Sequence, residues 1–250
     1  MSQWRMNWVW GKVTLAWGGF SVMLAFFAIP LLSLFVGRKR AFPIVARLWT
    51  KAMLNIGGVG RRRQGWEDLP EDIRGGRQPA IFMSNHESHL DVPVMISSLE
   101  VNAVFIAKQE LKRVPFLGQI IWFMNFIFID RKDRTQAIDS LQKAAARIRE
   151  GQSVVIFPEG TRTLDGHLRN FKKGGFALAL DAGVPIVPAA MRGGFKVLPK
   201  GATRVNPGHY ALVFGEPVYP AALPSREALM EEVRSRIEAL VLRADALLAE

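Results

Sequence analysis

The sequence lacks cysteine, has only two tyrosines and four histidines, and carries no acidic side chain in its first 63 residues. The missing cysteine excludes disulfide bonds, thiolate nucleophiles and cysteine metal ligands. The missing acids concentrate the basic charge at one end, because residues 1–63 hold ten Lys and Arg and so contribute +10 of the formal net charge of +11. In the rest of the chain, 23 basic and 22 acidic side chains nearly cancel.

The basic N-terminal quarter is also the most apolar part of the chain. Residues 13–36 carry no charge over 24 positions, which is long enough for a helix to span a bilayer. Arg38-Lys39-Arg40 follows and predicts that this end faces the cytoplasm, at the inner membrane. A segment that is both basic and apolar favours anionic membrane lipids over nucleic acid as its partner. Tryptophans crowd the front end, as interfacial anchors do: Trp4, Trp8, Trp10 and Trp17.

A second helical pattern covers residues 41–56, with an apolar side and a basic side. It is typical of an amphipathic helix that lies in the membrane interface. Gly18, Gly19 and Pro30 weaken a straight span in the first segment, so two helices dipping into one leaflet compete with one crossing. The first segment could also be a cleaved signal peptide or a helix in a soluble core. The basic residues after the apolar run disfavour the signal peptide.

Residues 57–63 read Gly-Gly-Val-Gly-Arg-Arg-Arg. The glycines predict a hinge, and the arginines predict either a patch that seeks phosphate or a solvated run of charge. We therefore place a boundary at this point. Residues 1–60 are predicted to form N-terminal membrane-anchoring helices, and residues 61–250 a second domain.

Apolar runs alternate with helical patterns from residue 80 onward. Such alternation predicts an α/β layered domain with a mostly parallel sheet. The predicted strands cover residues 80–84, 103–107, 126–130, 153–157, 185–190 and 210–214. The predicted helices cover residues 92–98, 116–124, 135–150, 174–182 and 225–248.

Residues 80–91 read Ala-Ile-Phe-Met-Ser-Asn-His-Glu-Ser-His-Leu-Asp. The apolar start predicts a strand, so His86 falls in the following loop and Asp91 near a helix start. The loop can fold the carboxylate onto one imidazole nitrogen, which leaves the other nitrogen to take a proton from a hydroxyl. The pair has no nucleophile of its own, so that hydroxyl must come from a substrate. A pairing of Asp91 with His89, a metal site built from all three side chains, and a purely structural role are also compatible with the pattern.

A second group of polar side chains follows the strand predicted at residues 153–157. Pro158 ends the strand and Gly160 permits a sharp turn. Glu159, Thr161 and Arg162 then lie at the carboxyl end of the strand, where open α/β sheets bind ligands. The forked guanidinium of arginine suits a phosphate. The alternative is a turn in which Arg162 and Glu159 only pair with each other.

Further charges follow two neighbouring predicted strands. Lys108 comes after residues 103–107, Asp130 ends the strand at residues 126–130, and Arg131 follows it. Because the carboxyl ends of parallel strands meet at one edge, we expect these side chains beside His86. A base next to positive charge, in a chain with a membrane anchor, predicts acyl chemistry on a phosphorylated amphiphile.

Four segments resemble the motifs of glycerolipid acyltransferases, in the same order and spacing across residues 60–220. The segments are Asn85-His86-Glu87-Ser88-His89-Leu90-Asp91, which resembles their His-x4-Asp motif, Phe128-Ile129-Asp130-Arg131, Phe157-Pro158-Glu159-Gly160-Thr161-Arg162-Thr163 and Val187-Pro188-Ala189-Ala190. Among these enzymes the chain looks most like the bacterial 1-acylglycerol-3-phosphate acyltransferases. They carry a two-helix membrane anchor, which favours the one-leaflet arrangement for residues 1–60. A glycine usual just before their second motif is replaced by Asn125.

The resemblance implies a role for each matching residue. His86 would be the general base and Asp91 its orienting acid. The substrate-binding residues would be Lys108, Arg131, Glu159, Gly160, Thr161 and Arg162. The implied reaction moves a fatty acyl chain from a thioester donor to the sn-2 hydroxyl of lysophosphatidic acid and gives phosphatidic acid. Acyl-CoA or acyl-acyl-carrier-protein would be the co-substrate, and we expect no cofactor, no metal and no covalent acyl-enzyme.

Three further functions are compatible with the sequence. The first is acylation of another lyso-lipid, such as lyso-ornithine lipid. The second is hydrolysis of the thioester, with water as acceptor. The third, from a different class, is binding of membrane lipids without catalysis. Dependence of the reaction on Arg131 and Arg162 would distinguish a phosphorylated acceptor from the others.

Overall fold

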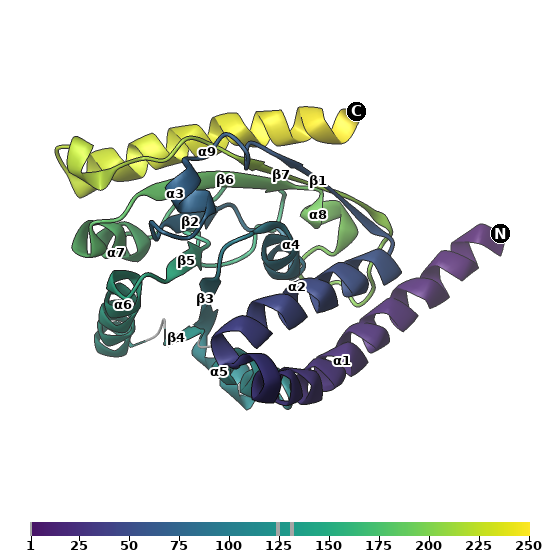
Figure 1. Ribbon diagram of the computed structural model, residues 1–250. Helices are drawn as coiled ribbons and strands as arrows, with labels where there is room; N and C mark the ends of the chain where they lie inside the picture. The colour runs from purple at the N-terminus through teal and green to yellow at the C-terminus, as the bar shows by residue number, and fades with distance from the viewer. Residues whose placement is uncertain (1, 124–125, 131–132) are drawn as a thin grey trace.

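The computed structural model describes residues 2–123, 126–130 and 133–250 (Figure 1). The described residues form a seven-stranded sheet in the order β1-β7-β6-β2-β5-β3-β4. Every neighbouring pair is parallel except β6 and β7, so the predicted α/β fold with a mostly parallel sheet is confirmed. The strands are β1 (Val59–Gln64), β2 (Ile81–Ser84), β3 (Ala103–Lys108), β4 (Ile127–Ile129), β5 (Ser153–Ile156), β6 (Ile186–Arg192) and β7 (Gly208–Phe214).

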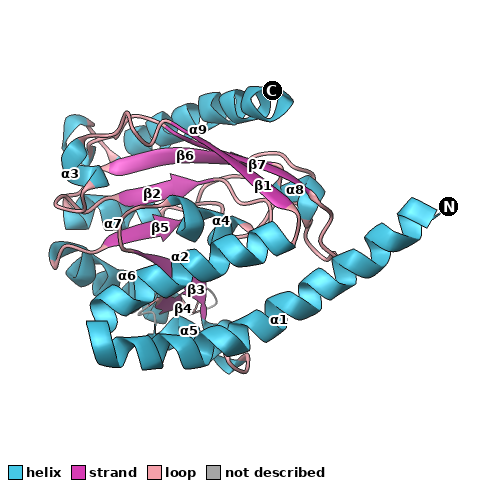
Figure 2. Cartoon of the chain, turned by 45° about the vertical axis from the view of Figure 1, so that its right-hand side comes forward, coloured by secondary structure: helices cyan, strands magenta, loops and turns pink. Residues whose placement is uncertain are grey.

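Helices cover both faces of this sheet (Figure 2). The α-helices are α1 (Ser2–Val36), α2 (Arg38–Ile56), α3 (Glu71–Arg74), α4 (Asp91–Ser98), α5 (Leu117–Phe123), α6 (Arg134–Arg149), α7 (Gly174–Ala182), α8 (Gly194–Val197) and α9 (Arg226–Ala249). Two short 3-10 helices, η1 (Gln109–Arg113) and η2 (Pro220–Ala222), complete the set within the described ranges. Helices α6, α7 and α9 pack together on one face, whereas α4 and α5 connect strands across the other. Crossovers between parallel strands are right-handed, which sends connections that run in opposite directions to opposite faces.

The central strands β2 and β5 are buried at every position. Their residues are the continuous apolar runs that a strand needs when helices cover both of its faces. Each of the six strands expected from the sequence is present, with ends shifted by a few residues. The parallel strands β2, β3, β4, β5 and β6 therefore deliver their carboxyl ends to one edge of the sheet.

Strand β1 corrects the prediction of a hinge at residues 57–63. Val59–Gln64 pairs in parallel with β7, from Val59 opposite Gly208 to Gln64 opposite Val213. Arg61, Arg62 and Arg63 gave this segment a sequence that does not resemble a strand. They form neither a solvated run of charge nor a patch of unpaired cations for phosphate. Their guanidinium groups donate hydrogen bonds to Asn55, to the carbonyls of Leu247 and Ser98, and to Glu67 and Glu100. Pairing with β7 thus overrides the low strand propensity of the sequence.

The N-terminal quarter forms two helices that run side by side (Figure 1). Helix α2 packs against α4, and α1 packs against α2 and α5. Both helices are longer than the apolar patterns alone indicate. In the part of the chain that the structure describes, no helix is sufficiently long and apolar to cross a membrane. The division of the chain at residue 60 stays a prediction.

Candidate active site

His86 and Asp91 lie together at the carboxyl end of β2. The Nδ1 atom of His86 is 2.7 Å from Oδ2 of Asp91, which confirms that the loop folds back as its spacing predicts. Asp91 is fully buried, whereas the side chain of His86 keeps 17% of its surface exposed. The carboxylate begins α4, where the helix dipole favours negative charge. A solvent-accessible imidazole is therefore held by an inaccessible acid.

The hydrogen bonds of Asp91 fix the tautomer of His86. Its Oδ2 accepts from the backbone N–H groups of Glu87 and Ser88, at 2.7 and 2.9 Å. Its Oδ1 lies 3.1 Å from the hydroxyl of Tyr210. A carboxylate that receives this many donors is an acceptor only, so Nδ1 of His86 carries the proton. The Nε2 atom of His86 is left as the basic nitrogen.

Asn85 sets the position of His86 at the end of the strand. Its side-chain amide donates to the carbonyl oxygen of Met191 at 2.8 Å and accepts from the N–H of the same residue at 2.7 Å. The side chain thereby continues the ladder between β2 and β6 by one step. His86 is attached directly to this clamp, which limits its backbone freedom.

The segment after β5 holds His86 from the other side. Glu159 is buried and uses both carboxylate oxygens, accepting from the N–H of His86 at 2.7 Å and from that of Arg169 at 2.9 Å. Burial raises the pKa of Glu159 above its ordinary value, although these two N–H groups oppose the shift. The N–H of Thr163 donates to the carbonyl of His86 at 2.8 Å. The ring of Phe157 stacks on the imidazole at 4.1 Å between centroids.

Arg162 brings positive charge to the same edge. Its guanidinium forms no hydrogen bond or ion pair with any other described side chain, so a pairing with Glu159 is excluded. The pKa of His89 is lowered, mainly by partial burial and to a smaller extent by the positive charges of Arg162 and His86. His89 does not replace His86 as the partner of Asp91. Partial burial lowers the pKa of Arg162 itself.

The turn that carries Arg162 also contains Gly160 and Thr161, and Lys200 lies against it. Gly160 has φ of 72°, a left-handed conformation that favours glycine. Lys200, which no sequence pattern indicates, places Nζ 3.5 Å from the hydroxyl of Thr161. The two residues are 39 positions apart in the chain, so no spacing connects the lysine with the turn. The turn after β5 thus carries Arg162 and lies beside a second cation, Lys200.

Lys108 ends β3 and Asp130 follows β4, the two strands furthest from β2 among those that end at this edge of the sheet. Strand β5 lies between β2 and β3, which separates the axes of β2 and β3 by roughly 10 Å. Lys108 is 52% exposed and pairs with Glu110 at 2.8 Å. Such an exposed pair contributes little and opens readily for a ligand. Arg131 and Asn125 lie outside the described residues, so their expected places stay predictions.

Glu87 and Arg192 form a network that the sequence motifs do not indicate. Arg192, the last residue of β6, donates to Glu87 Oε1 at 2.7 Å, to the carbonyl of Gly166 at 2.9 Å and to Asp245 at 2.7 Å. The N–H of Phe195 donates to the other oxygen of Glu87 at 3.0 Å. Burial raises the pKa of Glu87 to about 7 despite these donors. The rule that strand ends meet at one edge applies to Arg192 and would have found it.

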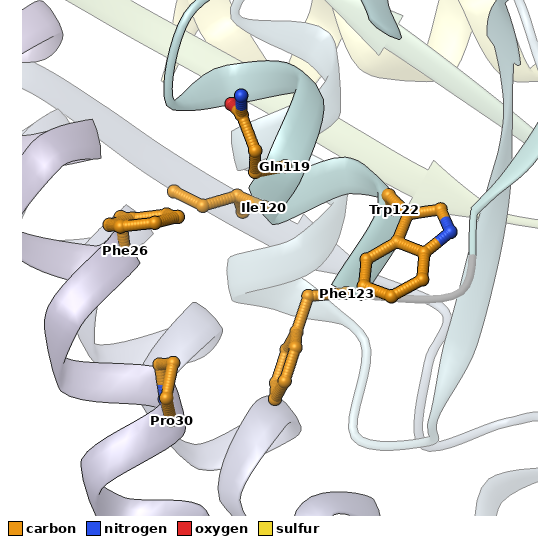
Figure 3. A pocket seen from close by; sticks show the side chains of 6 residues that line it. All are labelled: Phe26, Pro30, Gln119, Ile120, Trp122 and Phe123. Atoms are coloured by element: carbon orange, nitrogen blue, oxygen red, sulfur yellow. The ribbon is translucent and has the colours of Figure 1, made fainter.

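An apolar hollow of about 220 Å³ lies between α1 and α5 (Figure 3). Phe26 and Pro30 come from α1, and the facing residues of α5 are Gln119, Ile120, Trp122 and Phe123. Among these six described lining residues, Gln119 contributes a polar amide and the other five are apolar or aromatic. In the described ranges no group of three or more His, Asp or Glu side chains is arranged to hold a metal ion.

The base, its buried acid and the nearby cations lie together at the edge of a mostly parallel sheet, an arrangement that can take a proton from a hydroxyl beside an anionic group. The Acyltransferase family profile matches residues 61–192, which is just over half of the chain. The chain belongs to this family.

Known relatives point to one branch of it. A chloroplastic 1-acyl-sn-glycerol-3-phosphate acyltransferase of Brassica napus is 33% identical over 83% of this chain, and one of Borreliella burgdorferi is 34% identical over 59%. The chain spans 58% and 57% of the lengths of these two relatives. The crystal structure of the 1-acyl-sn-glycerophosphate acyltransferase PlsC of Thermotoga maritima superimposes with a TM-score of 0.77 at 27% identity. That match covers 100% of this chain and 99% of the other.

Proposed function

We propose that this protein transfers a fatty acyl chain from a thioester donor to the sn-2 hydroxyl of 1-acylglycerol-3-phosphate and forms phosphatidic acid. The observation that carries the proposal is the hydrogen bond between His86 Nδ1 and Asp91 Oδ2 at 2.7 Å. It leaves a basic Nε2 on a partly exposed ring, and no nucleophilic side chain among the described residues is hydrogen-bonded to it. Such a base suits a substrate hydroxyl.

The reaction begins with the sn-2 hydroxyl hydrogen-bonded to Nε2 of His86. Nε2 takes the proton as the oxygen attacks the thioester carbonyl, and a tetrahedral oxyanion forms. Asp91 stabilises the imidazolium through the bond to Nδ1. The intermediate then expels the thiolate, which receives the proton from Nε2, so the base returns to its starting state. Removal of the proton by a positioned base contributes roughly 10²–10⁴-fold to such a step.

Arg162 is the group that we assign to the phosphate of the acceptor. Its guanidinium has no competing partner among the described side chains, and its planar fork matches a phosphate. Thr161 lies on the same turn, Lys200 reaches its hydroxyl from the segment after α8, and Lys108 ends β3 at the same edge of the sheet. Glu159 and Gly160 contribute by shaping that turn, because Glu159 spends both oxygens on backbone N–H groups.

Helices α1 and α2 serve in the proposal as an anchor that dips into one leaflet of the inner membrane from the cytoplasmic side. Apolar side chains are exposed along both helices, and burying them in lipid removes this surface from water. They include Phe20, Leu24, Phe27, Leu31, Leu34 and Phe35 on α1, and Ile44 and Leu48 on α2. The apolar hollow between α1 and α5 is then a suitable place for a fatty chain (Figure 3).

The chemistry needs no metal and no cofactor beyond the co-substrate, because the donor is already activated as a thioester. Acyl-CoA and acyl-acyl-carrier-protein both supply such a donor. An anionic lipid surface would hold the basic N-terminal quarter, and nucleic acid has no part in the reaction.

The deciding experiment offers purified protein in anionic vesicles each thioester donor in turn, acyl-CoA and acyl-acyl-carrier-protein, with three acceptors in parallel. The acceptors are 1-acylglycerol-3-phosphate, a lyso-ornithine lipid and water alone. We expect phosphatidic acid from the first acceptor and little thioester loss with the others. Thioester consumption without phosphatidic acid would assign another acceptor, and no consumption with either donor would assign a lipid-binding protein without catalysis.

A further inference from the structure

Tyr210 is connected to the buried acid of the site from a distant part of the sheet. It lies in β7, 119 residues along the chain from Asp91, and its hydroxyl is 3.1 Å from Asp91 Oδ1. Three N–H groups, from His86, Glu87 and Ser88, donate to Oδ2 instead. Among the described residues, Tyr210 is the sole hydrogen-bond donor to Oδ1.

The surroundings leave this hydroxyl little freedom. Tyr210 and Asp91 are both fully buried. A methyl group placed on Gly194 would lie 2.6 Å from the Tyr210 hydroxyl and 2.9 Å from Asp91 Oδ1, so only a glycine fits beside the pair. Burial, together with the negative charge of Asp91, raises the pKa of Tyr210 well above its ordinary value. The phenol therefore keeps its proton and donates it throughout the range in which the enzyme would work.

We propose that Tyr210 is a positioning residue, which fixes the rotation of the Asp91 carboxylate and thereby the direction of the His86 imidazole. This inference rests on the proposed function of the His86–Asp91 pair. Without the hydroxyl, Oδ1 is a buried acceptor with no partner, and the carboxylate gains by rotating toward another donor. Rotation moves Oδ2 away from Nδ1, so His86 loses its orientation while the phosphate pocket around Arg162 is unchanged.

The two tyrosines of the chain provide a matched pair of variants. Tyr210→Phe removes one oxygen atom and keeps the ring that packs in the core. Tyr219→Phe makes the same chemical change at an exposed position before η2. Both variants are assayed as full-length protein in the same vesicles, with phosphatidic acid as the product measured. Thermal unfolding of each variant reports whether the folded fraction has changed.

We expect Tyr210→Phe to lower kcat about tenfold, as loss of a hydrogen bond to a charged group does, and to leave KM for the lyso-lipid near that of the wild type. Tyr219→Phe keeps wild-type values. A kcat for Tyr210→Phe equal to that of Tyr219→Phe overturns the proposal. A loss of activity that only follows the loss of folded protein overturns it as well.

A second measurement separates this inference from the acyltransferase assignment, because it needs no substrate. The proton on Nδ1 of His86 gives a nuclear magnetic resonance signal that is identified by its absence in His86→Asn. Tyr210→Phe should move or broaden this signal, and Tyr219→Phe should not. A moved signal in a protein that acylates nothing would support the positioning role and reject the proposed reaction. An unmoved signal in an active Tyr210→Phe protein would reject the positioning role alone.

Discussion

The Glu87 carboxylate and the Arg192 guanidinium form an ion pair of 2.7 Å between the loop that carries His86 and the end of β6. Glu87 is almost entirely buried, and Arg192 also holds Asp245 of α9 at 2.7 Å. The pair therefore ties the catalytic loop to the sheet and to the last helix. Its contribution should appear in the stability of the fold.

At pH 8, above the pKa of about 7 of Glu87, replacing Arg192 by methionine should destabilise the protein by about 2–3 kcal/mol, because a buried carboxylate is left without its cation. The same change at Arg149, which pairs with Asp181 at an exposed position, should cost less than about 0.5 kcal/mol. Urea unfolding of both variants measures the difference. Equal midpoints for Arg192→Met and Arg149→Met would show that the Glu87 pair does not stabilise the fold.

Glu87 should also make stability depend on pH. Its pKa is raised from 4.5 to about 7, so the folded state keeps a proton that the unfolded chain releases. The stabilising contribution is complete below pH 4.5 and is lost as the pH rises to 7, a change of about 3 kcal/mol. Glu87→Gln cannot titrate, so the unfolding free energy of the wild type should fall relative to that variant between about pH 5 and 7. Parallel curves for the two proteins would contradict this prediction.

Arg162 should act on acceptor binding more than on turnover. Removing a guanidinium that contacts phosphate should raise KM for 1-acylglycerol-3-phosphate about tenfold or more in Arg162→Ala. Arg243→Ala removes the same charge from an exposed position on α9 and should leave KM unchanged. Steady-state assays over a range of lyso-lipid concentrations give both values. An equal KM in the two variants would remove Arg162 from the phosphate site.

Membrane attachment should depend on the exposed apolar side chains of α1. Leu31 and Leu34 face outward, the latter with 80% of its surface exposed. Changing both to glutamate should weaken partitioning to anionic vesicles more than about tenfold, since each leucine buried in lipid contributes about 1.5–3 kcal/mol. Leu242→Glu on α9, where the side chain is 71% exposed, is the control. Vesicle sedimentation that gives the same bound fraction for the wild type and both variants would exclude α1 from the attachment.

The sequence predicted those parts of the fold and site in which local pattern decides the structure. Six buried strands appeared as apolar runs, and the His86–Asp91 pairing followed from a five-residue spacing beside a helix start. Strand β1 was missed because its arginines hide a pairing that only β7 provides. Tyr210 was missed for a related reason, since it sits within an apolar strand and reaches Asp91 only because the sheet brings β7 beside β6. Contacts between residues so far apart in the chain produce no local sequence pattern from which they could be predicted.

The central claim is that His86 removes the proton from the acceptor hydroxyl, and the most direct test is the single-turnover rate of phosphatidic acid formation in His86→Ala. The account predicts a fall of roughly 10²–10⁴-fold, with thermal unfolding little changed and with His209→Ala, at an exposed position in β7, as active as the wild type. A His86→Ala protein that forms phosphatidic acid at the wild-type rate would contradict the account.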